Sequence, residues 1–350
     1  MSKRTAMIAM GGNSLSPKGE AGTISQQFAH TRETLEGIGH FIERGYNLCI
    51  NHGNGPQVGN ELLRMDLTHD KVPPLPLGIC VAGTQGSIGY MIQQSLQNKL
   101  RDMDTDREVV TIVTQVIVDK NDPSIKDPSK YVGTRYSEEE ANSFAEKFGW
   151  NIKEQESGQW RRVVPSPMPE YIMHGDSIKT LVDRGTIVIA SGGGGIPVYN
   201  NEDGHLEGLD AVIDKDYAAA KLGRILHAEE LWIITDVDNV YLNYGKENQE
   251  SLLILSASDA EKLYEKGEFQ QGSIGPKIKA AMHFLKYHGK KVIITSIPCI
   301  QAALDGKAGT EIRNEKLKYM NIKARNFLPI LACPYRMAMF SKIWKMLNLP

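Results

Sequence analysis

Short apolar segments alternate along this chain with longer stretches of helical periodicity, and this alternation narrows the possible folds more than any other feature. Thr5–Met10 and residues 46–51 are apolar runs of strand length, and a helical repeat begins between them near Thr23. A second helical stretch covers residues 78–101, and residues 109–118 have the pattern of a further buried strand. Because strands that alternate with helices assemble into mostly parallel sheets, the sequence predicts the α/β class.

The same alternation returns in the second half of the chain. The expected elements are a helix at 174–184, a strand at 186–191, a helix after Lys215, a strand at 231–235, helices at 257–266 and 277–288, and strands at 291–296 and 310–312. Residues 119–170 interrupt the pattern with several prolines and a charged helical stretch at 137–148. We interpret the interruption as a subdomain that is inserted after a core strand and projects from the sheet, within a domain of residues 1–312.

Composition and charge exclude several classes of protein. The formal net charge is −2 over 350 residues, which gives no sign of nucleic-acid binding. The apolar run near the N-terminus is too short for a signal peptide, and no run has the length of a membrane span. Structural zinc and a disulfide framework are not expected, and reduced thiols fit a cytoplasmic protein. The cysteines, which are widely spaced, are Cys49, Cys80, Cys299 and Cys333.

Residues 313–350 differ in composition from the rest of the chain. They carry eight lysines and arginines against one acid, about +7, whereas residues 1–312 carry 32 basic against 41 acidic residues, about −9. Such a segment fits either a basic amphipathic helix for a membrane or a partner, or an extension outside the folded domain. The second interpretation is favoured, because the α/β pattern is complete without this tail.

Glycine-rich loops follow three of the predicted strands. They contain Gly11 and Gly12, residues 53–59, and residues 192–195. In an open α/β sheet, ligands bind beyond the carboxyl ends of the strands. Glycines there let backbone N–H groups approach the oxygens of an anion without an intervening side chain. Three such loops on one edge of the sheet therefore predict a phosphate or carboxylate site.

The sequence Val-Ile-Asp-Lys-Asp, which ends at Asp216, adds charged groups to this site. A helix that starts at Asp214 places two carboxylates on its first turn, where the helix dipole favours them. Lys215 is unfavourable at that end of a helix, so we expect an anionic ligand to hold it there. Lys130 follows Asp-Pro-Ser and Lys277 follows Gly-Pro, both turn-like contexts. Three such lysines, held by Asp216, suit phosphoryl transfer, in which charge on the transferred oxygens must be neutralised.

Several common nucleotide-binding and hydrolase motifs are absent. No Gly-x-x-x-x-Gly-Lys-Ser/Thr occurs, which excludes a Walker-type nucleotidase. The run Gly53-Asn54-Gly55 opens like a dinucleotide fingerprint, but its third glycine falls one place late at Gly59. No acidic residue ends a strand at the distance that a ribose-binding carboxylate requires, so an NAD-dependent dehydrogenase is disfavoured. No Gly-x-Ser-x-Gly elbow is present.

Eight segments of the chain, taken in order, resemble one family. They are Ala-Met-Gly-Gly-Asn at 9–13, His-Gly-Asn-Gly-Pro-Gln-Val-Gly at 52–59, Asp-Pro-Ser-Lys at 127–130, Trp-Arg-Arg-Val-Val-Pro-Ser-Pro at 160–167, Gly-Gly-Gly-Gly-Ile-Pro-Val at 192–198, Val-Ile-Asp-Lys-Asp at 212–216, Ile-Thr-Asp-Val-Asp at 234–238 and Gly-Ser-Ile-Gly-Pro-Lys at 272–277. Over nearly all of residues 1–312 the chain resembles carbamate kinases of the amino-acid-kinase superfamily.

The resemblance implies a three-layer α/β/α sandwich built on an eight-stranded, mainly parallel open sheet, and a homodimer. It also implies the reversible reaction of ATP and carbamate to ADP and carbamoyl phosphate. Mg²⁺ would be carried by the nucleotide, without a metal site of the protein's own. The reaction is often run toward ATP in arginine-deiminase or related catabolism. The expected partners are therefore small-molecule substrates, without nucleic acid or membrane.

The resemblance also assigns roles to residues by position. The catalytic residues would be Lys130, Lys215, Asp216 and Lys277, with Asp216 organising the lysines. The phosphoryl group and carbamate would be bound by Gly11, Gly12, Asn13, Gly53, Asn54 and Gly55. The nucleotide would be bound by Gly193, Gly194, Lys215, Asp236 and Lys277.

Two alternatives stay open at this point. A kinase of the same fold could act on another small carboxylate or phosphate acceptor, although Lys130 in the inserted subdomain argues against it. A non-catalytic nucleotide-binding regulator would need the loss of one of the three lysines, and Lys130, Lys215 and Lys277 are all present.

Overall fold

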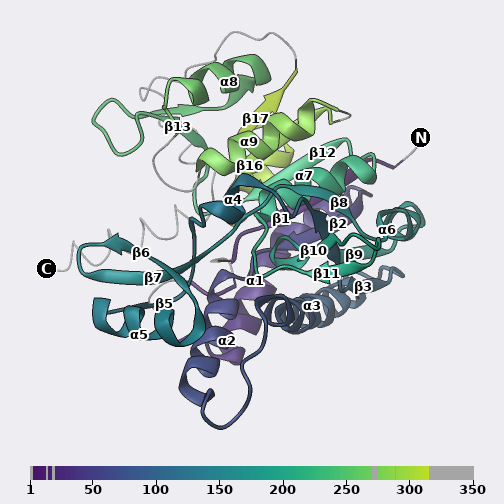
Figure 1. Ribbon diagram of the computed structural model, residues 1–350. Helices are drawn as coiled ribbons and strands as arrows, with labels where there is room; N and C mark the ends of the chain where they lie inside the picture. Colours follow the sequence, from purple (N-terminus) through teal and green to yellow (C-terminus); the bar gives the residue numbers. More distant parts are fainter. Residues whose placement is uncertain (1–2, 13–14, 18–19, 270–273, 288, 315–350) are drawn as a thin grey trace, which may run out of the picture.

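Six parallel strands form the centre of the fold, and two further strands extend the sheet at one edge (Figure 1). The computed structural model describes residues 3–12, 15–17, 20–269, 274–287 and 289–314. The order across the sheet is β3 (Val109–Ile112), β9 (Ile187–Ala190), β2 (Asn47–His52), β1 (Thr5–Met10), β12 (Glu230–Ile234), β16 (Lys291–Thr295), β17 (Thr310–Arg313) and β15 (Ile254–Ser256). Strand β17 is antiparallel to β16 and parallel to β15. The eight-stranded, mainly parallel sheet is confirmed.

The central strands are apolar along their whole length because helices cover both faces of the sheet. In β1, Met7 and Ala9 belong to the core on one face and Ile8 and Met10 to the core on the other, all of them fully buried. The first face is covered by α7 (Lys215–Ile225) and α9 (Ile274–Leu285), and the second by α1 (Ile24–Glu43) and α3 (Leu77–Asp102). A strand buried on both faces has a continuous apolar run instead of an alternating one. The three-layer sandwich is confirmed.

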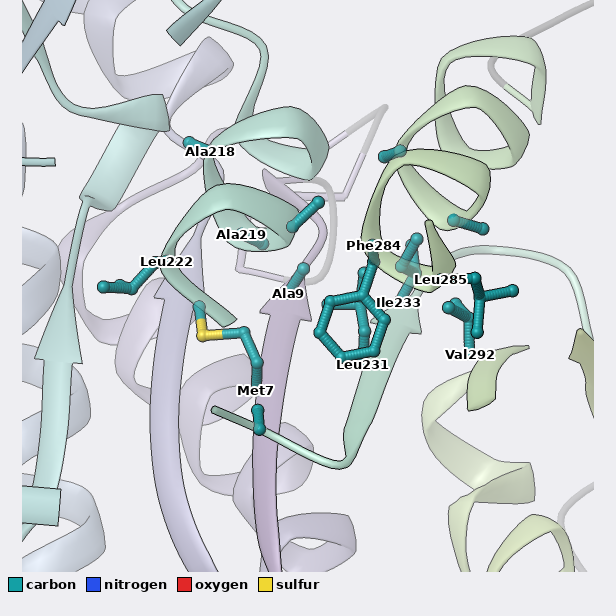
Figure 2. Close-up of a cluster of buried hydrophobic side chains, with 14 of the residues drawn as sticks. Met7, Ala9, Ala218, Ala219, Leu222, Leu231, Ile233, Phe284, Leu285 and Val292 are labelled. Carbon is teal, nitrogen blue, oxygen red and sulfur yellow. The ribbon is translucent and has the colours of Figure 1, made fainter. Parts of the chain in front are cut away.

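Small side chains bring α7 close to the middle of the sheet. Figure 2 shows Ala219 of α7 near Ala9 of β1, with Phe284 of α9 beside Leu231 of β12. Because alanine ends at Cβ, the backbone of α7 can approach the strand closely, and the large ring fills the space under α9. This packing fixes the first turns of both helices at the edge where the strands end.

The helix boundaries follow capping signals in the sequence. Helix α1 begins after Thr23, whose side chain forms a capping box with Gln26. The other helical elements beside the main sheet are α2 (Gly55–Thr68), α6 (Gly175–Asp183), η2 (Gly192–Gly194), α8 (Ala257–Glu265), η3 (Ile297–Cys299) and α10 (Ile300–Leu304). The predicted helices after Thr23, at 78–101, at 174–184, after Lys215 and at 257–266 are confirmed. None of the helices among the described residues is long and apolar enough to cross a membrane.

The single strand predicted at 109–118 is wrong, because this segment forms two strands in different sheets. Strand β3 ends at Ile112, and β4 (Gln115–Val118) joins a four-stranded sheet of order β11-β10-β4-β8. Thr114 lies between them, where its N–H donates to Gln85 and its hydroxyl accepts from the N–H of Ser191. These buried hydrogen bonds fix the turn, and apolar periodicity alone does not reveal it. The other strands of this sheet are β8 (Pro169–Ile172), β10 (Ile196–Asn200) and β11 (Leu206–Gly208).

Residues 119–170 hold a small sheet that lies apart from the main one, at the lower left of Figure 1. It consists of β5 (Lys130–Tyr136), β7 (Gln159–Val164) and β6 (Asn151–Glu156), with α4 (Pro123–Lys126) before it and α5 (Glu138–Phe148) beside it. We call these elements the projecting unit. Ser137 caps α5 in a capping box with Glu140, as the predicted charged helix requires. A separate hairpin joins β13 (Val240–Leu242) and β14 (Glu250–Leu252).

Candidate active site

A cavity of about 430 Å³ opens at the carboxyl ends of β1, β2, β9 and β12. Its walls come from the loops after these strands, from the first turns of α2, α7 and α9, and from β5 and β7 of the projecting unit. The polar and glycine residues that line it are Gly11, Gly12, Gly53, Asn54, Gly55, Lys130, Tyr131, Gly133, Arg161, Gly193, Asp214, Lys215, Asp216, Thr235, Asp236 and Lys277. The three lysines singled out in the sequence therefore face one cavity, at the edge where ligands bind in open α/β sheets.

Asp216 lies at the centre of the charged groups. Its carboxylate is buried, and each oxygen accepts one ammonium: Oδ1 from Lys215 Nζ at 2.5 Å and Oδ2 from Lys277 Nζ at 3.0 Å. The side chains of Lys215 and Lys277 are 14% and 10% exposed. One carboxylate thus fixes two ammonium groups side by side in the cavity wall.

Burial and the neighbouring charges shift the pKa values of Asp216 and Lys215. Burial alone would raise the pKa of Asp216, but the neighbouring ammonium groups outweigh it and lower this pKa to about 2. Burial lowers the pKa of Lys215, the charge of Lys277 acts in the same direction, and the charge of Asp216 opposes both. Asp216 is therefore a fixed counter-ion at neutral pH and not a proton carrier.

Lys130 reaches the cavity from the projecting unit but pairs with a different carboxylate. Its Nζ donates to Asp214 Oδ2 at 3.2 Å, and its side chain is 44% exposed. The expectation that Asp216 organises all three lysines is therefore met for Lys215 and Lys277 in this structure, and not for Lys130. Lys130 and Asp214 are 84 residues apart in the sequence, so this pair could not be predicted from the sequence.

The contacts at the start of helix α7 also differ from those expected from the sequence. Asp214 is the N-cap of α7, and its Oδ1 accepts the N–H of Asp216 at 2.9 Å. That N–H is consequently satisfied by the protein itself. Lys215 is held at the first turn by the carboxylate of Asp216, so a side chain of the protein stabilises it there in addition to the anionic ligand that the sequence led us to expect.

Two glycine loops meet at the floor of the cavity. A Cβ on Gly53 would lie 2.6 Å from the backbone nitrogen of Gly12 and 3.4 Å from Lys215 Cδ. The N–H groups of Gly11 and Gly53 donate to the carbonyls of Ile234 and Met10. Gly53 thus provides space for the close approach of the two loops, while the N–H groups of Gly11 and Gly53 bond to the backbone and do not point into the cavity as free donors.

The glycine loop at residues 192–195 packs tightly against the loop that contains Asn54. Gly193 has a φ of +66°, and a Cβ there would lie 2.2 Å from the side-chain nitrogen of Asn54. Asn54 in turn donates to the hydroxyl of Thr84 at 2.9 Å. Gly194 packs against the carbonyl of Ile213 and does not line the cavity. Only glycine fits these two positions of the loop.

His52 lies directly beneath these loops but does not fit an acid–base role. It is 1% exposed, and its Nδ1 lies 3.0 Å from the carbonyl of Gly53. Burial lowers the pKa of His52 to about 4, with the charge of Lys215 acting in the same direction. The ring is therefore neutral at physiological pH.

The remaining sequence-predicted residues divide into two groups. Gly55 and Asp236 line the cavity, Asp236 as an exposed side chain after β12. Asn13 lies outside the described residues, as does the tail from residue 315 onward. In the described part of the chain, no group of three or more His, Cys, Asp or Glu side chains could hold a metal ion.

Arg161 is a lining residue that the sequence analysis did not assign. It lies on β7, and its guanidinium donates to the carbonyl of Gly133 at 2.8 Å. Tyr131 and Thr235 also line the cavity without having been predicted. The only signal for Arg161 was its place in the Trp-Arg-Arg segment, because its approach to the cavity depends on the pairing of β5 with β7.

An open parallel sheet whose carboxyl edge carries glycine loops and a cluster of ammonium groups is typical of α/β proteins that bind a phosphorylated ligand.

The model of the amino acid kinase family matches residues 4–296. Carbamate kinase from Pyrococcus furiosus is 46% identical over 314 residues, which cover 89% of this chain and 99% of that protein. Carbamate kinase 2 from Staphylococcus epidermidis is 44% identical over 313 residues, covering 88% and 99%. The structure of carbamate kinase from Giardia lamblia bound to AMP-PNP superposes with a TM-score of 0.84 at 39% identity, covering 89% of this chain and 99% of that one. The chain belongs to the amino acid kinase family and, within it, to the carbamate kinases.

Proposed function

We propose that this protein catalyses the reversible transfer of a phosphoryl group between ATP and carbamate, giving ADP and carbamoyl phosphate. The observation that carries the proposal is the convergence of Lys130, Lys215 and Lys277 on one cavity at the carboxyl edge of the sheet. The relatives named carbamate kinase, which match over nearly their whole length, support the same reaction. We further propose that the reaction runs toward ATP in arginine catabolism of the deiminase type.

The proposed chemistry moves one PO₃ unit between two oxygens. In the ATP-forming direction, the bond between phosphorus and the carbamate oxygen breaks while a β-phosphate oxygen of ADP bonds to phosphorus. Most of the catalytic task is positioning and neutralisation of charge on the transferred oxygens. Lys215 and Lys277 would neutralise that charge, while Asp216 keeps both ammonium groups in place without touching the substrate.

We assign the two substrates to two different sets of residues in the cavity. The nucleotide would lie toward Gly193, Asp236 and Lys277, with Mg²⁺ bound to its phosphates as part of the substrate. The structure of the Giardia lamblia relative bound to AMP-PNP supports a nucleotide site in this family.

Carbamate and the transferred phosphoryl group would lie toward Gly11, Gly12, Asn13 and residues 53–55. Lys130 would reach them from residues 119–170, which we propose to be an inserted subdomain of the domain 1–312. This arrangement is supported by the position of Lys130 at the start of β5, on the wall of the cavity opposite the main sheet.

The purified full-length protein is expected to form ATP from ADP and carbamoyl phosphate at a rate of about 1–100 s⁻¹, the usual range of kinases. The measurement is a coupled ATP-formation assay with carbamoyl phosphate, run beside an ATP-consumption assay in which an acylated amino acid, a nucleoside monophosphate and a phosphonate are the alternative acceptors. A chain that ends at Asn314, after β17, tests whether the tail contributes. Turnover with another acceptor only, or nucleotide binding without any turnover, would replace the proposed function by one of the two alternatives.

We also propose that the protein is a cytoplasmic homodimer. Helix α3 supports this by presenting two large apolar side chains to solvent, Ile79 at 54% and Tyr90 at 58% exposure, with the exposed Gly83 and Gly86 between them. Helices with small residues at such positions can pack closely against a second copy. Cys49 and Cys80 are buried free thiols, as is usual for proteins in reducing compartments. Light scattering is expected to give twice the chain mass of 38.9 kDa, and the mass of a single chain at micromolar concentration would contradict the dimer.

A further inference from the structure

Asp214 connects the two charged parts of the cavity. Its Oδ1 accepts the backbone N–H of Asp216, and its Oδ2 accepts the ammonium of Lys130. Asp216 two residues later holds Lys215 and Lys277. Two carboxylates at one helix start therefore hold three lysines that come from three separate segments of the chain.

We propose that Asp214 is a positioning residue for phosphoryl transfer, which keeps Lys130 directed into the cavity until the substrate anion takes over the ammonium. The proposal rests on the proposed function, because it assumes that Lys130 contacts the acyl phosphate. Among the described residues, Asp214 is the only ion-pair partner of Lys130. A lysine side chain that is 44% exposed has several rotatable bonds and would otherwise sample many conformations in solvent.

The position of the Asp214 carboxylate is fixed, so Asp214 is a partner that does not move when Lys130 does. Its side chain is 19% exposed, and the bond from the N–H of Asp216 anchors one oxygen to the start of α7. When a substrate anion arrives, Lys130 can move toward it, whereas Asp214 cannot follow. Holding a catalytic group near its working position before binding reduces the entropy that must be lost later.

The net charge of the cavity favours the movement of the Lys130 ammonium from Asp214 to the substrate anion. Four cationic side chains line it, Lys130, Lys215, Lys277 and Arg161, against three carboxylates, Asp214, Asp216 and Asp236, so that the formal sum is +4 − 3 = +1. An entering acyl phosphate carries more negative charge than this excess. The ammonium of Lys130 is the most exposed of the three lysines and the one whose partner is not shared, so it is the cation that can be released to the substrate.

The test distinguishes two roles of Asp214, namely positioning Lys130 and capping helix α7. Asparagine keeps the oxygen that caps α7 but cannot form the ion pair, so Asp214→Asn is expected to leave the unfolding temperature and the KM for ADP unchanged. It is expected to lower kcat/KM for carbamoyl phosphate about tenfold, the scale of a direct coupling between two side chains. Asp214→Ser also caps without pairing and gives the same test if Asp214→Asn does not fold. The control is Asp127→Asn, which breaks an exposed pair with Lys153 in the projecting unit and is expected to leave kcat/KM unchanged.

A double-mutant cycle with Lys130→Met decides whether Asp214 acts through the lysine. Lys130→Met should itself lower kcat/KM for carbamoyl phosphate, and adding Asp214→Asn should then cause no further loss. Losses that multiply in the double variant, or an Asp214→Asn enzyme as active as the unmodified one, would overturn the positioning role and leave the proposed function intact. Unchanged kcat/KM in Lys130→Met would overturn the acceptor site of the proposed function, and this proposal with it.

Discussion

Replacing Lys215 or Lys277 by alanine is expected to lower turnover in ATP formation at least about a hundredfold, because preorganised charge in a water-poor site is worth about 3–4 kcal/mol to the transition state. Both ammonium groups are almost buried and are held on opposite oxygens of Asp216. They meet the substrate without having to reorganise, which is the property that makes such groups effective. Each variant should stay folded, because the remaining lysine still pairs with Asp216.

The measurement is kcat at saturating ADP and carbamoyl phosphate, with circular dichroism and thermal unfolding as checks on folding. Lys286→Ala provides the matched control, because this exposed lysine directly follows α9, the helix that carries Lys277. It should retain the turnover of the unmodified protein. Near-normal turnover in both Lys215→Ala and Lys277→Ala would mean that this cavity is not where the phosphoryl group is transferred.

Much of the fold is encoded in patterns that are local along the chain. Strand β1 is a six-residue apolar run because both faces of the sheet are covered, and its length already indicates a strand. The capping boxes at Thr23 and Ser137 involve residues three positions apart, so they can be found without a structure. For this reason the predicted class and most of the predicted helices agree with the structure.

The errors come from interactions between distant residues. The turn at Thr114 separates two strands because Gln85 and Ser191 hydrogen-bond to it, 29 and 77 residues away. The three strands of the projecting unit were not predicted, since strands β6 and β7 are partly exposed and rich in charged residues. Hydrophobic periodicity reports burial along one element and contains no information about such partners.

In the candidate site too, features that are local in the sequence could be predicted, whereas contacts between distant residues could not. The lysines could be found because each follows a proline or an aspartate within two positions, in a turn-like context. Their partners could not be found from the sequence: Lys277 and Asp216 are 61 residues apart, and Lys130 and Asp214 are 84 apart. The glycines at 11 and 53 were predicted as donors, but their N–H groups bond to neighbouring strands. The sequence identifies the groups that carry charge, while their pairing follows only from the packing of α7, α9 and β5.

Replacing Asp216 by asparagine is expected to lower the free energy of unfolding by about 3–5 kcal/mol, the usual cost of removing one partner from a buried ion pair. The substitution keeps the shape of the side chain but leaves two ammonium groups next to each other at a site with little water. Turnover should fall as well, since neither lysine keeps its position. Urea unfolding at neutral pH measures the difference in stability.

Asp176→Asn is the matched control for this variant. Asp176 and Asp216 occupy the same position in the first turn of their helices, α6 and α7, so both interact with a helix dipole. Asp176 is exposed, whereas Asp216 is 3% exposed. A small loss in the control and a large loss at Asp216 would assign the effect to the buried lysines and not to the dipole.

The pH dependence of the stability difference between the unmodified protein and Asp216→Asn gives an independent check. Because the pKa of Asp216 is lowered from 3.8 to about 2 in the folded protein, its contribution is complete above pH 3.8 and is lost as the pH falls toward 2. In the variant, Asp216 no longer opposes the burial that lowers the pKa of Lys215, and only the weaker influence of the Asp214 charge still does, so the folded state carries a penalty for keeping this lysine protonated. That penalty shrinks as the pH rises toward the ordinary value of 10.5 and disappears above it, where the lysine is neutral in both states. The stability difference should therefore be largest near neutral pH and narrow in acid and in alkali. A difference that stays constant from neutral pH to about pH 10 would contradict the view that Asp216 is the counter-ion of this cluster.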